Sequence, residues 1–97
     1  VMLQVTSEAM ERLRKMIEEQ TTDPEMAIRI TLNPSVAMQL DLTLDREKKG
    51  DQVVRSEEGV KILLLQSEVA EKLEGLVLDY QAMFPGEGFT ILKPTFH

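Results

Sequence analysis

The 97-residue sequence has no cysteine and no tryptophan, and it contains only one tyrosine, three phenylalanines and one histidine. The absence of cysteine excludes disulfides, thiol catalysis and thiolate metal ligands within these residues. The scarcity of aromatic side chains predicts an aliphatic core in which the six methionines fill gaps. There is no run of 18 apolar residues, and no basic region followed by an apolar stretch opens the chain. We therefore expect no membrane span and no signal peptide, and a cytoplasmic protein.

Acidic residues outnumber basic ones by 17 to 11, which gives a net charge of −6. Binding to nucleic acid or to an anionic membrane surface needs clustered Lys and Arg, so we expect neither partner. The charge is compatible with a basic protein partner or with solubility alone. The chain length predicts one domain that covers residues 1–97, because a second core of useful size would not fit.

An amphipathic helix is expected near the start of the sequence. Thr6 and Ser7 offer hydroxyls that can cap its first turn. The apolar residues Met10, Leu13 and Ile17 follow at spacings that place them on one helical face. Residues 21–24 (Thr-Thr-Asp-Pro) end the helix. A second, short helix is expected from a cap at Ser67 to residue 73 or 74.

Short strands account for most of the remaining sequence. The strongest strand pattern covers residues 38–45, where apolar and polar side chains alternate strictly. The expected strands are residues 2–5, 26–32, 38–45, 52–55, 60–65, 76–80 and 89–92. After residue 26 the connections are too short for helical crossovers, which predicts antiparallel pairing. The sequence therefore predicts a mainly β fold, a small antiparallel β-sandwich or half-barrel with an N-terminal amphipathic helix and one short helix.

Several short motifs follow one another along nearly the whole chain. They are Thr6-Ser7-Glu8-Ala9, Ile28-Arg29-Ile30, Asp45, Asp51-Gln52-Val53-Val54, Glu58-Gly59-Val60-Lys61-Ile62, Leu78-Asp79-Tyr80, Gly88-Phe89 and Lys93-Pro94. No single motif is specific, but their order and spacing resemble the HesB-like or IscA-like domain of the A-type iron–sulfur carriers. The resemblance implies a HesB-like fold, self-association and a link to iron–sulfur cluster assembly.

The chain departs from this family where the family binds iron. Family members use one cysteine in a Gly-Cys-Ser-Gly-like loop and two in a Cys-Gly-Cys tail, and thiolates are the ligands that such metals select. Here the loop reads Asn33-Pro34-Ser35-Val36-Ala37, and the sequence runs from Pro94 to His97 without a cysteine pair. We therefore transfer no catalytic, cofactor-binding or metal-binding residue and expect no cofactor. The resemblance implies a cysteine-less, non-catalytic bacterial member with an accessory or protein-interaction role.

An alternative is a small-ligand or divalent-metal binding protein, since carboxylate oxygens suit hard cations. The candidate ligands are Asp41, Asp45, Asp79, Glu57, Glu58 and Glu87, although none has EF-hand spacing. Asp79 lies inside an apolar strand, which predicts that its carboxylate accepts hydrogen bonds. His97 is the sole imidazole and a candidate terminal metal ligand, and the methionines are candidate thioether ligands for a soft metal.

Catalysis and self-association are the remaining possibilities that the residues address. A nucleophilic Ser or Thr needs a neighbouring base, and the only histidine lies at position 97, so we expect no enzyme activity. The strand at residues 38–45 has the pattern of a sheet edge, which can pair with a second copy of the chain.

Overall fold

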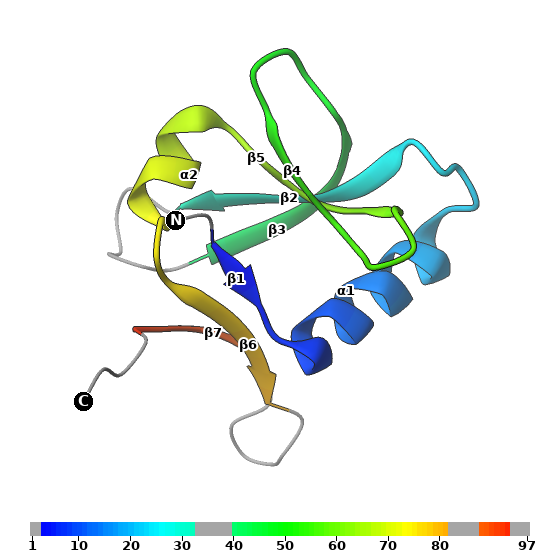
Figure 1. Cartoon of the computed structure of the whole chain (residues 1–97). Coiled ribbons are helices and arrows are strands. Elements are labelled where there is room, and N and C mark those ends of the chain that lie inside the picture. The colour runs from blue at the N-terminus through cyan, green and yellow to red at the C-terminus, as the bar shows by residue number, and fades with distance from the viewer. Residues whose placement is uncertain (1–2, 33–39, 82–87, 94–97) are drawn as a thin grey trace.

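The computed structural model describes residues 3–32, 40–81 and 88–93. Seven short strands and two helices make up this part of the chain (Figure 1). In chain order they are β1 (Gln4–Val5), α1 (Ser7–Gln20), β2 (Met26–Leu32), β3 (Leu40–Arg46), β4 (Gln52–Arg55), β5 (Lys61–Leu65), α2 (Ser67–Lys72), β6 (Val77–Gln81) and β7 (Gly88–Leu92). The prediction of a mainly β fold with one long and one short helix is confirmed.

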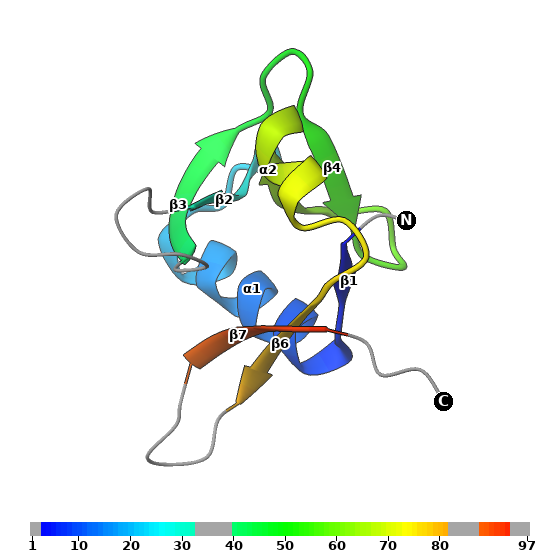
Figure 2. The ribbon, with the colours of Figure 1, turned by 90° about the vertical axis from the view of Figure 1, so that its left-hand side faces the viewer.

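Helix α1 forms where the sequence provides both a cap and an apolar stripe. The Thr6 hydroxyl accepts a hydrogen bond from the backbone N–H of Ala9 at 3.2 Å, which satisfies one donor of the first turn. Ala9 and Leu13 are fully buried on the inner face. The helix packs against β2 and β5 on one side and against β6 on the other. It therefore lies between the two sheets of the molecule (Figure 2).

The larger sheet has four strands in the order β3-β2-β5-β4. Strand β2 pairs with β3 in antiparallel fashion but with β5 in parallel, with Ile28 opposite Leu63. The prediction of antiparallel pairing throughout is therefore wrong. Because β3 and β4 lie at opposite edges, the chain between β2 and β5 makes its crossover with two strands instead of a helix. That route needs no long helical connection, so the short loops do not prevent parallel pairing.

The smaller sheet has three strands in the order β1-β6-β7. Strands β6 and β7 form an antiparallel pair, while β1 joins β6 in parallel, with Gln4 opposite Val77. The rings of Tyr80 and Phe89 lie 4.9 Å apart between their centroids, and the guanidinium carbon of Arg12 is 5.7 Å from the centre of the Tyr80 ring. These contacts connect the small sheet to α1. Both sheets are thus mixed rather than antiparallel.

One cluster of buried apolar side chains joins both sheets and α1, and Val69 and Ala70 of α2 pack against it. Its members are Leu3, Ala9, Leu13, Ile28, Ile30, Ile62, Leu63, Leu65, Leu73 and Leu78. All are aliphatic, as the scarcity of aromatic residues predicts. Helix α2 packs against β2 and β5, which helps to explain why residues 62–65 of β5 are buried without interruption.

Most predicted boundaries lie within two residues of the observed ones. Residues 26–32 and 52–55 form strands as predicted. The predicted cap at Ser67 is wrong, because α2 begins at Ser67 itself and its capping residue, Gln66, makes no side-chain cap hydrogen bond. Gly75 follows this helix with a φ of +79°, which a glycine adopts without strain. Residue 2 of the predicted strand 2–5 and residues 38–39 of the predicted strand 38–45 lie outside the described residues.

Candidate functional site

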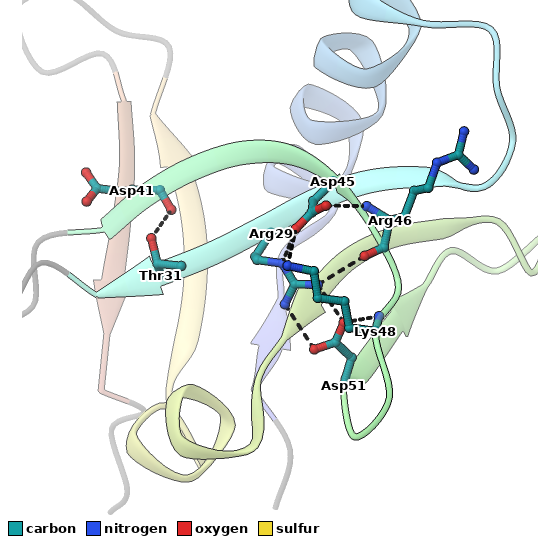
Figure 3. Close-up of polar contacts among 7 residues, drawn as sticks. All are labelled: Arg29, Thr31, Asp41, Asp45, Arg46, Lys48 and Asp51. Atoms are coloured by element: carbon teal, nitrogen blue, oxygen red, sulfur yellow. Dashed lines mark hydrogen bonds and ion pairs between the residues drawn. The ribbon is translucent and has the colours of Figure 1, made fainter.

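A largely buried cluster of charged side chains, of which Asp45 is partly exposed, lies on the four-stranded sheet, where the chain crosses from β3 to β4 (Figure 3). Arg29 projects from the middle of β2, and its side chain is only 6% exposed. Its Nη1 and Nη2 atoms donate to the two carboxylate oxygens of Asp51 at 2.9 and 2.6 Å. Its Nε atom donates to Asp45 at 2.7 Å, and Nη2 also donates to the backbone carbonyl of Arg46 at 3.1 Å.

The two carboxylates are held by their own local backbone as well. Asp51 is 1% exposed, and its Oδ2 atom accepts the backbone N–H of Lys48 at 2.7 Å. The Asp51 N–H donates to the Lys48 carbonyl, which closes a turn in which Gly50 has a φ of +87°. Asp45 accepts the N–H of Arg46 at 2.8 Å. The connection between β3 and β4 is thereby fixed to β2.

These contacts alter the proton affinities of all three side chains. Hydrogen bonds from Arg29 lower the pKa of Asp45 to about 2, and the Arg46 N–H acts in the same direction. Arg29 also lowers the pKa of Asp51, while the bidentate bond to Asp51 raises the pKa of Arg29. The three groups therefore stay charged at neutral pH. We refer to Arg29, Asp45 and Asp51 as the Arg29 cluster.

The Arg29 cluster explains part of the motif pattern in the sequence. Arg29, Asp45 and Asp51 belong to three of the motifs that resemble the A-type carriers, and the fold brings them together. Because the carboxylate oxygens already accept hydrogen bonds from Arg29 and from the backbone, the cluster has the character of a structural ion-pair network. It fastens a chain crossing, and nothing in its geometry suggests a metal or a reacting group.

A second polar contact lies at the start of α1. The Thr6 hydroxyl donates to the Asp79 carboxylate at 2.7 Å, while the same oxygen accepts the Ala9 N–H. The Thr6 N–H donates to the Leu78 carbonyl at 3.0 Å. The prediction that the Asp79 carboxylate accepts a hydrogen bond is confirmed, with Thr6 as the donor. The contact ties the first turn of α1 to the middle of β6.

Among the described residues, the other candidate carboxylates, Asp41, Glu57 and Glu58, do not assemble into a site. Asp41 points outward from β3, and Glu57 and Glu58 lie on the turn between β4 and β5. Within residues 3–32, 40–81 and 88–93, no three carboxylate or imidazole side chains gather in a way that suits a metal ion. Glu87 and His97 lie outside the described residues, as do the loop at 33–37 and the residues that follow Lys93.

A surface groove of about 560 Å³ runs between α1 and the β4–β5 turn. Val5 and Met10 provide apolar lining, and charged side chains of both signs surround them. Arg14 forms ion pairs with Glu18 at 3.2 Å and with Glu58 at 3.6 Å, so part of this rim is already neutralised. The groove was not predicted from sequence, because it depends on the β4–β5 turn packing beside α1 and no local pattern signals that placement.

The Arg29 cluster was also not predicted, although the sequence contains a signal for it. Arg29 is the only charged residue in the strand Met26–Leu32, between two buried isoleucines. A charge at such a position needs buried partners of opposite sign.

The described helices offer no candidate for a membrane crossing, since none is both long and apolar enough.

Comparison with solved structures identifies the same architecture in known proteins. A protein from Aquifex aeolicus solved by NMR superposes with a TM-score of 0.66 and 27% identity, over 95% of this chain and 91% of that one. Escherichia coli SufA, described as involved in the biosynthesis of iron–sulfur clusters, superposes with a TM-score of 0.68 and 20% identity, over 95% of this chain and 85% of SufA. IscA with a [2Fe-2S] cluster superposes with a TM-score of 0.63 and 21% identity, over 96% of this chain and 86% of IscA.

The sequence itself matches no family model and no curated protein. The similarity is therefore one of three-dimensional structure, and it extends over 95–96% of this chain and 85–91% of the compared chains. The predicted resemblance is confirmed at this level: the chain has the fold of the A-type iron–sulfur carriers SufA and IscA, built from a sequence without cysteine.

Proposed function

We propose that this protein is a cysteine-less, non-catalytic relative of the A-type iron–sulfur carriers with an accessory, protein-binding role in cluster assembly. The observation that carries the proposal is the full-length structural similarity to SufA and IscA combined with the absence of cysteine from all 97 residues. We also propose a single-domain, cytoplasmic, bacterial protein. Two of the similar structures come from Aquifex aeolicus and Escherichia coli.

The internal contacts support a retained scaffold. The side chains of Arg29 and Asp51 are almost completely buried and bind each other through two hydrogen bonds. Breaking such a pair typically costs about 3–5 kcal/mol, so a chain that keeps the fold must keep both partners. A protein of this kind can still present the surface of a carrier to the proteins that recognise one.

The first experiment tests whether this protein itself holds an iron–sulfur cluster. The purified protein is incubated anaerobically with iron and sulfide, passed through gel filtration and analysed for iron, with SufA treated in parallel as the positive control. We expect iron to co-elute with SufA but not with this protein, because no thiolate is available to hold it. Stoichiometric iron on this protein would overturn the non-carrier part.

The accessory role is tested with cluster-loaded SufA. We expect that adding this protein at equimolar concentration changes the rate at which SufA transfers its cluster to an apo-ferredoxin. A variant with a reversed groove charge, Glu58→Lys, serves as a surface probe, and Glu71→Lys on the far helix α2 is its control. An unchanged transfer rate at every ratio of the two proteins would contradict the accessory role.

A further inference from the structure

The groove between α1 and the β4–β5 turn has the dimensions of a site for a short extended peptide. The lining residues on its α1 wall form one helical stripe from Ser7 to Glu18, with spacings of three and four. With a rise of about 1.5 Å per residue the stripe is about 16 Å long, which equals about five residues of extended chain. The groove volume of about 560 Å³ lies within the range of ligand sites.

An exposed ion pair connects the two walls of this groove. Arg14 of α1 lies 3.6 Å from a carboxylate oxygen of Glu58 on the turn, and its Nε atom lies 3.2 Å from Glu18 on the same helix. All three side chains are more than half exposed. Ion pairs this exposed contribute little to stability. The contact between Arg14 and Glu58 can therefore be exchanged for another one without loss of the fold.

These contacts favour an incoming cation over an incoming anion. A cation that takes Glu58 leaves Arg14 paired with Glu18, so no charge loses its partner. An anion that takes Arg14 leaves the carboxylates of Glu18 and Glu58 without theirs. Glu57, the neighbour of Glu58 on the turn, is exposed and has no ion pair with another described residue. It is available to the same cation.

The remaining basic residues of the groove do not offset this preference. Lys15 pairs with Glu11 at 3.9 Å, and the guanidinium of Arg55 donates to the Gly59 carbonyl at 3.1 Å within the turn. The lining contains four glutamates and three basic residues. The net charge of −6 on the whole chain adds a long-range attraction for a basic partner.

The floor of the groove supplies an apolar contact beside these charges. Val5 and Met10 pack against the core but stay partly exposed, so an apolar side chain placed on them would cover apolar area. Met10 precedes Arg14 by one helical turn, about 5.4 Å, which is close to the separation of about 6.8 Å between alternate residues of an extended chain.

We propose that this groove binds an extended segment of a partner protein in which an apolar residue and a lysine or arginine stand two positions apart. The apolar side chain covers Val5 and Met10, and the cation binds Glu57 and Glu58. This inference gives the protein-binding role proposed above a site and a class of ligand, and it rests on that role for the source of the segment.

A peptide titration followed by NMR tests the site. The probe is a pentapeptide with blocked ends and the sequence serine-leucine-serine-lysine-serine, added up to millimolar concentration. We expect it to shift the backbone amide signals of residues 7–18 and 55–58 and to leave those of α2 unchanged. Replacing its lysine by glutamate, or its leucine by serine, is expected to remove most of the effect. Absence of any shift, shifts confined to other surfaces, or an equal response to the glutamate peptide would overturn the proposal.

Paired substitutions test the part played by charge. The double variant Glu57→Gln with Glu58→Gln is expected to raise the Kd of the lysine peptide by roughly 2- to 30-fold, because two exposed ion pairs are lost. The double variant Glu68→Gln with Glu71→Gln makes the same change in net charge on the exposed surface of α2 and should leave the Kd unchanged. Equal weakening in both variants would show that only the overall charge of the chain attracts the peptide.

A readout on the wild-type chain does not depend on any variant. Limited oxidation by hydrogen peroxide, followed by mass spectrometry, measures how accessible each methionine sulfur is. The lysine peptide is expected to slow the oxidation of Met10, whereas Met26 at the start of β2 is outside the groove and serves as the internal control. Unchanged oxidation of Met10 at a peptide concentration that shifts the NMR signals would place the peptide elsewhere. None of these measurements contains SufA, so a failure of peptide binding is separate from a failure of the accessory role in cluster transfer.

Discussion

The two sheets of this molecule are joined to their surroundings through different chemistry. In the four-stranded sheet, Arg29 is buried with the Asp51 carboxylate, also binds the partly exposed Asp45, and uses four hydrogen bonds to fix a chain crossing. In the three-stranded sheet, one hydroxyl, that of Thr6, links α1 to the Asp79 carboxylate. Buried charges are costly once a partner is removed, whereas a single hydroxyl–carboxylate bond contributes modestly. The first sheet is therefore the more fragile to substitution.

The largest effect is expected from removing one charge of the Arg29 cluster. Asp51→Asn keeps the shape of the side chain but leaves Arg29 without its bidentate partner in a buried position. We expect the free energy of unfolding to fall by about 3–5 kcal/mol, measured by urea denaturation. Asp41→Asn, which removes an exposed carboxylate from the same sheet, should change it by less than about 0.5 kcal/mol. Equal effects of the two substitutions would show that the cluster is not a principal source of stability.

Lowering the pH should progressively remove the stabilisation that the Arg29 cluster provides. The pKa values of Asp45 and Asp51 in the folded state lie below the ordinary value of 3.8, so the unfolded chain binds protons more readily. The stabilisation is complete above that value and is lost as the pH falls toward 2, the folded-state pKa of Asp45. Urea midpoints measured between pH 5 and pH 2 should fall. The urea midpoint of the Asp51→Asn variant should depend less steeply on pH than that of the wild type. Equal pH dependence in the two proteins would argue that the acid sensitivity does not come from the Arg29 cluster.

A smaller effect is expected in the three-stranded sheet. Thr6→Ala removes both the cap of α1 and the bond to Asp79. We expect a loss of about 1–2 kcal/mol in the free energy of unfolding. Thr6→Ser keeps the hydroxyl and should restore most of that stability. If Thr6→Ala destabilises the chain as much as Asp51→Asn does, the contrast between the two sheets fails.

The sequence predicted those elements whose signals are local. The cap at Thr6 and the apolar spacing of Met10, Leu13 and Ile17 sufficed for α1. The strict alternation of residues 38–45 predicted the strand observed as β3 (Leu40–Arg46), and the position of β3 at a sheet edge is confirmed. The motif order also predicted the HesB-like fold. Each of the first two inferences uses residues that lie close together in the chain, where periodicity has direct structural meaning.

The features that were missed depend on contacts between distant residues. The parallel pairing of β2 with β5 follows from a crossover made by two strands, which loop lengths alone do not reveal. The uninterrupted apolar run at residues 62–65 was a usable signal, because central parallel strands have continuous apolar runs. The partners of Arg29 lie 16 and 22 residues away. The sequence alone could predict that Arg29 needs acidic partners, but only the fold shows that these partners are Asp45 and Asp51.

The parallel pairing of β1 with β6 has a consequence for how the chain is made. Gln4 and Val5 pair with Val77 and Leu78, and the Thr6–Asp79 bond spans 73 positions. During synthesis, β1 and the first turn of α1 leave the ribosome long before their partners exist. The four-stranded sheet, complete by Leu65, can form first. The N-terminal residues must then wait, unpaired, until the last third of the chain emerges to receive them.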